Sequence, residues 1–330
     1  MKKSLFCIIL FLLLLNSASA FNFNKYYDSS RYFIRINNNL LLNPAFTGFN
    51  NHFNLSAGFG SYTPDIPVSN DWSKPKEYIF APEFSFGKLL SYSFGLTKWI
   101  KNEGAFTSKQ INLAFSVSLQ TIKYGNFRIG FSGGSLSYTN DFSKLLFGDM
   151  INPKMGFIYS TQEILPSTGK YELKLDRYNA GIFYSYKNLF YIGYSILDFN
   201  EPMMSFYQDN HSILHSKSII TAGGRVKINK DFDVSASALV EHTSFYELTK
   251  IMPAVGVGYK CKYYFGGGIK LINSEFTSYY FQLYDDLFKC VTIAFKYELL
   301  KHNYFSNSLS PSYWGVSATF YIDNLIKFNK

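Results

Sequence analysis

The chain has 330 residues, of which 47% are hydrophobic, 19% are aromatic and 17% are charged. So much apolar and aromatic surface excludes a disordered chain, and a mean hydropathy of -0.05 excludes a bundle of long apolar helices. The net charge of +9 comes from scattered cations, so it gives no indication of nucleic acid as a partner. An outer-membrane β-barrel reconciles these values, because alternate residues of its strands face lipid and lumen.

The beginning of the chain is typical of a secretory signal peptide. Lys2 and Lys3 precede an apolar run over residues 6–15, and Ala18-Ser19-Ala20 provides a cleavage site. Residues 21–52 show no alternation of apolar and polar residues. We therefore predict a signal peptide (residues 1–20), a short periplasmic N-terminal segment (21–52), an outer-membrane barrel (53–322) and a C-terminal tail (323–330).

Strict period-two alternation recurs after residue 52, which predicts strands with one apolar and one polar face. In residues 111–120, for example, Ile111, Leu113 and Phe115 alternate with Asn112 and Ser116. The predicted strands are 53–61, 77–85, 90–99, 108–120, 125–138, 177–186, 188–198, 217–228, 232–242, 247–259, 262–271, 276–284, 287–299 and 313–322. The fold class is thus all-β, a transmembrane antiparallel β-barrel of about 14 strands.

A soluble sandwich would also alternate, but the lengths of the connections favour the barrel. The connections that follow the even-numbered strands are short, whereas most of those that follow the odd-numbered strands are longer. Outer-membrane barrels have short periplasmic turns and longer extracellular loops, and a sandwich has no reason for this asymmetry.

Two positions in the predicted strands need special backbone. Pro253 cannot donate to a strand ladder, so we expect a strand start or a bulge there. The run Gly130-Phe131-Ser132-Gly133-Gly134 matches a nucleophile elbow, but it lies in an alternating strand instead of a strand-turn-helix unit. We interpret its small residues as making room for bulky neighbours or backbone inside the barrel.

Signals for chemistry are poor. His211 and His215 lie four residues apart in an expected loop with no Cys beside them, so solvated histidines are favoured over metal ligands. Asp149, Asp198 and Glu201 fit no EF-hand spacing. We therefore predict no catalytic residues, no cofactor and no bound metal, and a protein that is not an enzyme.

Four charged residues share the polar faces of their strands and are predicted to face the lumen. Arg225 and Lys227 lie on the face of Thr221, and Lys296 and Glu298 share a face of their own strand. In a barrel such residues tune a channel or pair with a plug.

Several segments resemble the PorP/SprF family of type IX secretion system membrane proteins. Asn43, Pro44, Ala45, Phe46 and Gly48 match the motif that opens family members just before the first strand. Further likenesses follow in order: a central loop at Phe147, Gly148 and Asp149, a central hairpin around Gly181, and a Tyr-Asp turn at Asp285. Where members often carry Arg-x-Gln-Trp at the end of the first strand, this chain has Gly58-Phe59-Gly60-Ser61-Tyr62.

The resemblance implies a protein of the outer membrane of Bacteroidetes-type bacteria. Family members assist the secretion or cell-surface anchoring of proteins that carry a C-terminal targeting domain, notably adhesins, and some serve gliding motility. The implied partners are outer-membrane lipid, a secreted surface protein, and periplasmic or lipoprotein components of the secretion or motility machinery. We expect the external loops 147–163 and 201–215 to contact the cargo, and residues 43–48 to be structural or to meet periplasmic partners.

Two other functions remain open from the residues alone. A channel or transporter for hydrophobic or small polar solutes would use Arg225, Lys227, Lys296 and Glu298 along its path. An outer-membrane enzyme would need a convergent Ser/His/Asp set at one rim, which the sequence does not provide.

Overall fold

The computed structural model describes residues 39–49, 53–63, 75–87, 89–121, 125–145, 148–152, 154, 156–157, 160, 169–186, 189–204, 213–243, 248–260, 262–287, 291–300 and 312–322. The predicted signal peptide, the C-terminal tail, Phe147 and His211 lie outside these residues. None of the described helical segments has the length and apolar composition needed to cross a membrane.

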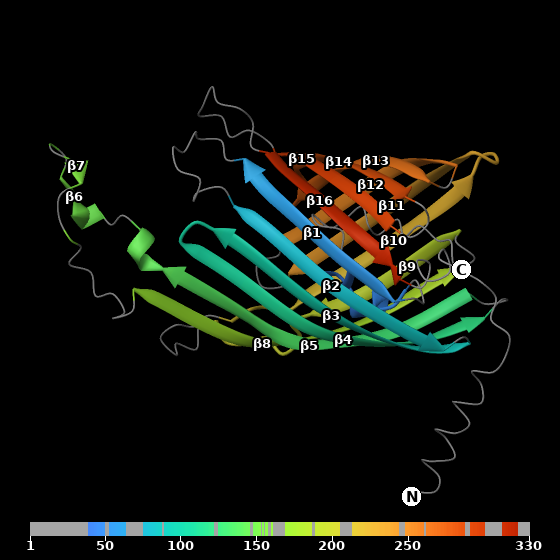
Figure 1. The fold of residues 1–330 in the computed structure, drawn as a ribbon, viewed down its shortest axis with the longest axis horizontal. Coiled ribbons are helices and arrows are strands. Elements are labelled where there is room, and N and C mark those ends of the chain that lie inside the picture. Colours follow the sequence, from blue (N-terminus) through green and yellow to red (C-terminus); the bar gives the residue numbers. More distant parts are fainter. Residues whose placement is uncertain are drawn as a thin grey trace, which may run out of the picture.

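Fourteen of the described strands form a closed antiparallel barrel in which neighbours along the chain pair with one another (Figure 1). The barrel strands are β1 (Asn54–Thr63), β2 (Lys76–Gly87), β3 (Leu90–Glu103), β4 (Phe106–Thr121), β5 (Gly125–Asp141), β8 (Lys170–Tyr186), β9 (Phe190–Leu197), β10 (Lys217–Lys227), β11 (Phe232–Thr243), β12 (Leu248–Tyr259), β13 (Tyr263–Ile272), β14 (Glu275–Leu287), β15 (Val291–Leu300) and β16 (Ser312–Tyr321). β1 pairs with β16, which closes the wall. The predicted fold and strand number are therefore confirmed.

Smaller elements are not strands of the barrel wall. They are the single helical turns η3 (Asn39–Leu41), η4 (Pro44–Phe46), η6 (Phe142–Lys144) and η7 (Gly148–Met150) and the two-stranded pair β6 (Ile151–Asn152) and β7 (Gly156–Phe157).

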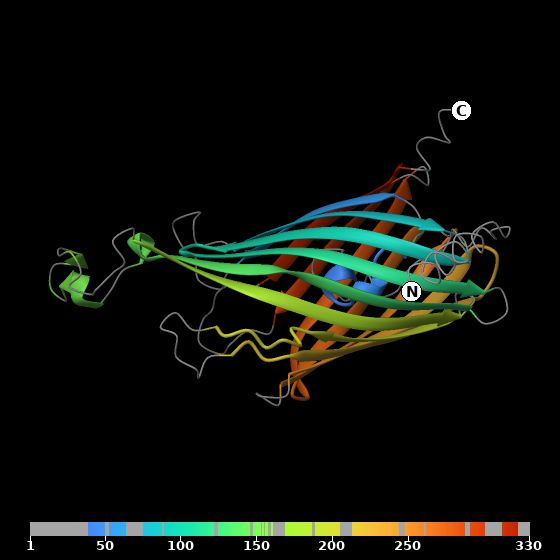
Figure 2. The ribbon, with the colours of Figure 1, turned by 90° about the horizontal axis from the view of Figure 1, so that it is seen from below.

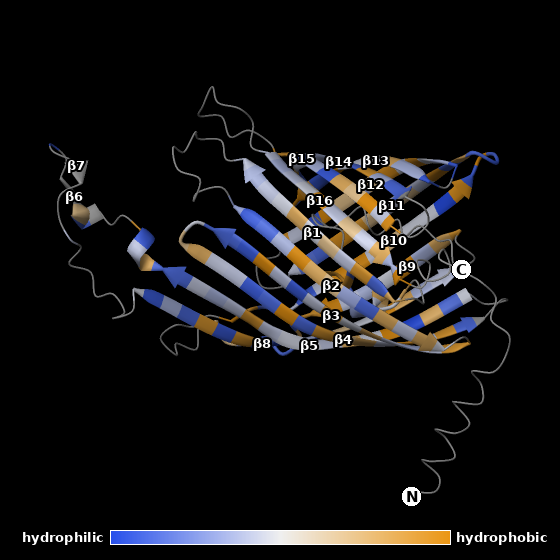
Figure 3. Cartoon of the chain, viewed as in Figure 1, coloured by the Kyte–Doolittle hydropathy of each residue, from blue (hydrophilic) through white to orange (hydrophobic). Residues whose placement is uncertain are grey.

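The two faces of the wall follow the alternation of the sequence. In β4 the side chain of Leu113 is 67% exposed on the outer face, whereas that of Ser116 is fully buried on the inner face. Figure 3 shows the same alternation of hydrophobic and hydrophilic residues along the other strands. Apolar side chains outside and polar ones inside reverse the pattern of a soluble protein, and they suit a wall surrounded by lipid.

The two ends of the barrel differ. At the end that we name the short-turn end, two to four residues join β2 to β3, β4 to β5, β8 to β9, β10 to β11, β12 to β13 and β14 to β15. At the opposite, long-loop end, β5 and β8 are each 17 residues long and stay paired with each other as far as Asp141 and Lys170 (Figure 2). β8 is paired with β9 only from Ala180 onward, so it continues well beyond the end of that strand, whereas β5 reaches one residue past β4. A strand tilted in a bilayer needs only about 9–11 residues to cross it. The hairpin of β5 and β8 therefore continues into the aqueous phase.

The projecting parts explain where the predicted strand limits were too short. The expectation ended one strand at residue 138 and began the next at 177, but β5 reaches Asp141 and β8 begins at Lys170. Lys170, Glu172 and Lys174 interrupt the apolar pattern because their part of β8 lies beyond the hydrocarbon. Hydropathy therefore reports the membrane boundary and not the end of the strand.

Pro253 lies within β12, so the prediction of a strand start or bulge at this residue is wrong. It pairs with Ala238 of β11. On the other side the ladder with β13 lacks two pairs and then resumes without a change of register at Ala254. The hydroxyl of Tyr280 donates instead to the carbonyl oxygen of Pro253 at 3.2 Å. A proline is thus accommodated by omitting the ladder bonds that it cannot make.

Candidate functional site: a segment inside the barrel

Residues 39–49, which we name the inner segment, lie within the barrel (Figure 2). Asn43 is 1% exposed, and Ala45 and Thr47 are fully buried. The prediction of a periplasmic segment over residues 21–52 is therefore wrong for this part, and residues 21–38 and 50–52 lie outside the described residues. The missing alternation excludes a strand here, but it does not indicate on which side of the wall the chain lies.

The motif residues give the inner segment its local shape. Asn43 caps η4: its Oδ1 accepts the backbone N–H of Ala45 at 2.8 Å, and Pro44 occupies the first helical position. These are the residue types that helix N-termini favour. Gly48 ends the turn with a φ of +62°, where a side chain would also collide with Ser93. The sequence therefore specifies a capped, single-turn element before it meets the wall.

Three glycines of the wall let this element approach the strands. They are Gly130 of β5, Gly181 of β8 and Gly193 of β9. An added Cβ at Gly130 would lie 2.4 Å from the backbone N of Ala45, and one at Gly181 would lie 2.0 Å from Oδ1 of Asn43. The interpretation that small residues around Gly130 admit backbone inside the barrel is confirmed.

Side chains then tie the inner segment to β8 and β9. Nδ2 of Asn43 donates to the carbonyl oxygens of Ile182 at 3.1 Å and Tyr194 at 3.3 Å. These two residues are paired across the β8–β9 ladder. Ser195 Oγ donates to the carbonyl oxygen of Leu42 at 2.6 Å. Asn43 therefore makes its local cap and two contacts with the wall with one amide.

Two charged side chains hold a single peptide group of the inner segment. Arg128 Nη2 and Ser116 Oγ donate to the carbonyl oxygen of Thr47 at 2.6 Å and 2.8 Å. On the opposite side of that peptide group, the N–H of Gly48 donates to Glu83 Oε2 at 2.8 Å. Hydrogen bonds to charged groups are about twice as strong as neutral ones. We name Glu83, Arg128 and the Thr47–Gly48 peptide group the peptide clamp.

Aromatic packing completes the contact. The ring of Phe46 lies 4.7 Å from that of Phe183 on β8, and Phe49 meets the same ring edge-on at 5.3 Å. Phe46, Phe183, Ala45 and Tyr191 form one buried hydrophobic cluster. Such aromatic pairs add about 0.5–1.5 kcal/mol each beyond their buried area.

The structure brings together one group of the predicted motif residues: Asn43, Pro44, Ala45, Phe46, Gly48 and Gly181. The remaining motif residues lie far from this group. Gly148 and Asp149 lie in η7, at the far tip of the long-loop end (Figure 1), and Asp285 lies near the short-turn end of β14. The motif is therefore not a single site.

Three of the four predicted lumen residues face inward, where each meets a polar or aromatic group. Arg225 forms an ion pair with Asp233 at 2.5 Å. Lys296 Nζ lies 4.7 Å from the centre of the Tyr280 ring, and Glu298 accepts from Ser278 at 2.7 Å. Lys227 is the last residue of β10 and is exposed. Its prediction as a residue that lines the lumen stays a prediction.

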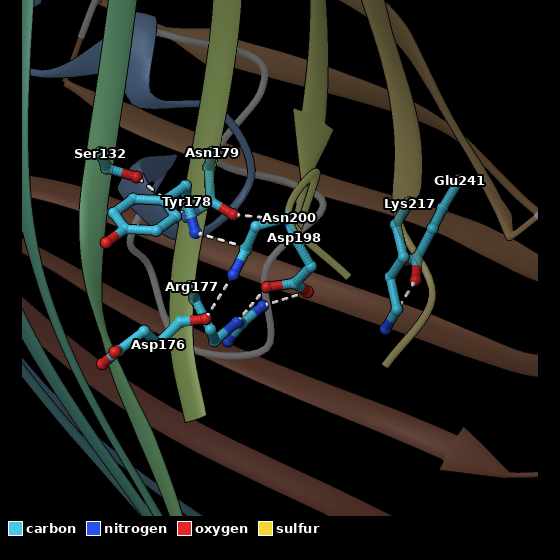
Figure 4. A network of polar contacts seen from close by, with 9 residues as sticks. All are labelled: Ser132, Asp176, Arg177, Tyr178, Asn179, Asp198, Asn200, Lys217 and Glu241. Carbon is cyan, nitrogen blue, oxygen red and sulfur yellow. Dashed lines mark hydrogen bonds and ion pairs between the residues drawn. The ribbon is translucent and has the colours of Figure 1, made fainter. Parts of the chain in front are cut away.

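A second polar network fixes the start of the loop that follows β9 (Figure 4). Arg177 of β8 binds both carboxylate oxygens of the fully buried Asp198, whose backbone N–H donates to Asn179 Oδ1 at 2.8 Å. Asn200 accepts the N–H of Tyr178 and donates to the carbonyl oxygen of Asp176. The side-chain amide of Asn200 thus continues the β8 ladder where β9 has ended.

Neutralising Asp198 should loosen this loop. Asp198→Asn keeps the shape of the side chain but leaves Arg177 buried without a charged partner, which costs about 3–5 kcal/mol. We expect amide hydrogen exchange over residues 198–204 and 213–216 to accelerate by about two orders of magnitude or more. Asp176→Asn, whose side chain is exposed on the same strand, is the matched control. Equal exchange in the two variants would contradict the anchoring role of the ion pair.

Five residues that contact the inner segment or admit it were not predicted as parts of a site: Glu83, Ser116, Arg128, Gly193 and Ser195. One signal pointed to Arg128: it is a charged residue on the inward face of an alternating strand. Among the described residues, no group of three or more His, Cys, Asp or Glu side chains is arranged to hold a metal ion.

Comparisons with known proteins agree with this barrel. The toluene transporter TodX of Pseudomonas putida is 10% identical over 92% of this chain and 98% of its own, with a TM-score of 0.51. The monoaromatic hydrocarbon channel CymD is 13% identical over 92% and 94% of the two chains, with a TM-score of 0.50. No curated protein matches the sequence. The family model described as "Type IX secretion system membrane protein PorP/SprF" matches residues 25–322.

Proposed function

The chain belongs to the PorP/SprF family of type IX secretion system membrane proteins, and we propose that it assists the secretion or surface anchoring of cargo proteins through their C-terminal targeting domain. It is an outer-membrane β-barrel of that system.

The projecting hairpin of β5 and β8 is the observation that carries this proposal. Its strands are 17 residues long, against about 9–11 needed to cross a bilayer. The loop at its tip, residues 142–169, contains the β6–β7 pair and the motif residues Gly148 and Asp149. A long structure beyond the membrane provides a surface for a protein that arrives at the cell surface. The network around Arg177 and Asp198 holds residues 198–200, which lead into the loop 201–215, against β8.

Shortening this hairpin tests the proposal. We expect that replacing residues 142–168 by a short Gly-Ser turn leaves the barrel folded and removes cargo from the cell surface. The surface proteins of the native host would be released by brief protease treatment and quantified by mass spectrometry. A matched control shortens residues 64–74, the loop between β1 and β2. An unchanged amount of surface cargo with the shortened hairpin would refute the cargo role. An equal loss of cargo in both strains would show that the cargo does not bind specifically to this hairpin.

A channel for hydrophobic or small polar solutes is the second candidate. The inward charges Arg225, Lys296 and Glu298 favour it, since they line the wall that a solute would pass. The inner segment disfavours it, because the segment occupies the half of the lumen nearer the short turns, where Arg128 and Gly130 follow the start of β5. We therefore propose that the inner segment acts as a plug and that the resting barrel does not conduct.

A further inference from the structure

Lysines gather at the short-turn end of the barrel, and they include Lys227, the exposed residue that the sequence predicted to line the lumen. Lys227 ends β10, Lys230 lies in the turn that follows, and Lys260 and Lys262 lie in the turn between β12 and β13. Lys227, Lys230 and Lys260 are exposed, and Lys262 is half-buried. We name these four residues the basic rim.

Aromatic and apolar side chains on the outer wall lie directly beside the basic rim. Ile228 is 67% exposed, and the rings of Phe232 and Tyr259 lie 5.0 Å apart. Lys260 Nζ lies 5.1 Å from the centre of the Tyr259 ring, and Lys262 donates to the hydroxyl of Tyr263 at 2.9 Å. Rings with a polar tip beside ammonium groups are typical of the boundary between hydrocarbon and headgroups.

The connections between the strands show the same polarity. Each of the six short connections contains at least one lysine, and together they contain seven lysines and one acidic residue, Asp231. The seven connections at the long-loop end contain four lysines and eight acidic residues. A protein partner would contact one sector of the rim, whereas lipid surrounds it. A lysine in every short turn therefore favours a lipid partner.

We propose that the basic rim is a binding site for anionic phospholipid headgroups in the leaflet on the short-turn side of the membrane. The ammonium groups pair with lipid phosphates while the neighbouring rings lie among the upper acyl carbons. The neighbouring Tyr259 and Tyr263 raise the pKa of Lys260 and Lys262 above its ordinary value, so these contacts favour the charged ammonium groups. The site would fix the depth of the barrel in the membrane.

The test uses the purified full chain in mild detergent with four lysines changed together, Lys227→Gln, Lys230→Gln, Lys260→Gln and Lys262→Gln. The matched control changes four exposed lysines toward the other end, Lys98, Lys109, Lys144 and Lys174, to Gln. Phosphatidylglycerol, phosphatidylcholine or inorganic phosphate is added to each protein. Bound lipid molecules are counted by native mass spectrometry, and the thermal unfolding midpoint is measured separately. Both variants are first checked for the barrel by their mobility on unheated and heated gels.

We expect phosphatidylglycerol to raise the unfolding midpoint of the unmodified chain and of the control, and its adducts to fall by about fivefold or more in the rim variant. Equal adducts in the rim variant and the control would overturn the proposal. Equal binding of phosphatidylcholine would overturn charge recognition, and an equal effect of inorganic phosphate would assign a free-anion site instead. Loss of a co-purifying acidic protein from the rim variant, with lipid adducts unchanged, would assign a protein partner instead.

Discussion

Adding one methyl group at each of Gly130 and Gly181 is expected to expel the inner segment and to let ions pass through the barrel. The added Cβ atoms would lie 2.4 Å from the backbone of Ala45 and 2.0 Å from Oδ1 of Asn43. Neither neighbour can move away without breaking the contacts that hold the segment. Overpacking of this kind costs about 1–3 kcal/mol per site, which shifts the docked equilibrium by about 5- to 150-fold each.

Conductance in planar bilayers is the measurement. The unmodified barrel should be almost silent, and the double variant Gly130→Ala with Gly181→Ala should carry a clear current. Gly133→Ala is the matched control, because Gly133 lies on the same strand but faces outward. An added Cβ there meets the movable ring of Tyr178 at 3.2 Å and the carbonyl oxygen of Arg177 at an ordinary 4.0 Å. This control should stay silent.

Hydrogen exchange over residues 39–49 makes the experiment decisive. If these amides exchange quickly in the double variant while the current stays at the level of the control, the segment has moved and is not a plug. If neither changes, the wall tolerates the methyl groups and the steric argument is wrong. A current in the unmodified protein would favour the channel function over a closed barrel.

The barrel itself could be predicted because its signals are local. Alternation is read from neighbouring residues, as in Leu113 and Ser116, and short connections identify hairpins without knowledge of distant contacts. The turn at Asn43-Pro44 was equally readable, since an Asn cap, a Pro and a following Gly act within a few residues. Each of these features depends on the backbone rules of a single short segment.

The site could not be predicted because its contacts are distant in sequence. The Asn43 amide meets carbonyl oxygens that are 139 and 151 residues away, and Thr47 meets Arg128 81 residues away. The alternation of apolar and polar residues along its strand indicates that Arg128 faces inward, but it does not indicate what Arg128 binds. The inner segment has no strand or helix period, so hydropathy alone assigned it to the periplasm. Only the closed barrel places these residues against one another.

Breaking the peptide clamp is expected to destabilise the barrel. Arg128 is fully buried and interacts electrostatically with Glu83, so Glu83→Gln would leave a buried guanidinium without its carboxylate. Removing one partner of a buried charge pair costs about 3–5 kcal/mol. Unfolding of the purified protein by urea in detergent, followed by gel mobility, measures the loss. Glu172→Gln, an exposed carboxylate on β8, is the matched control.

The double variant Glu83→Gln with Arg128→Met separates the clamp from two independent contacts. If the two charges act through one peptide group, the double change should cost less than the sum of the single changes, by about 0.5–3 kcal/mol. Additive losses would contradict the clamp, as would a Glu83→Gln variant as stable as the Glu172→Gln control. The clamp also holds the inner segment, so Glu83→Gln should conduct where Glu172→Gln does not if that segment is the proposed plug. A variant that loses stability and stays silent would show that the clamp serves the wall alone.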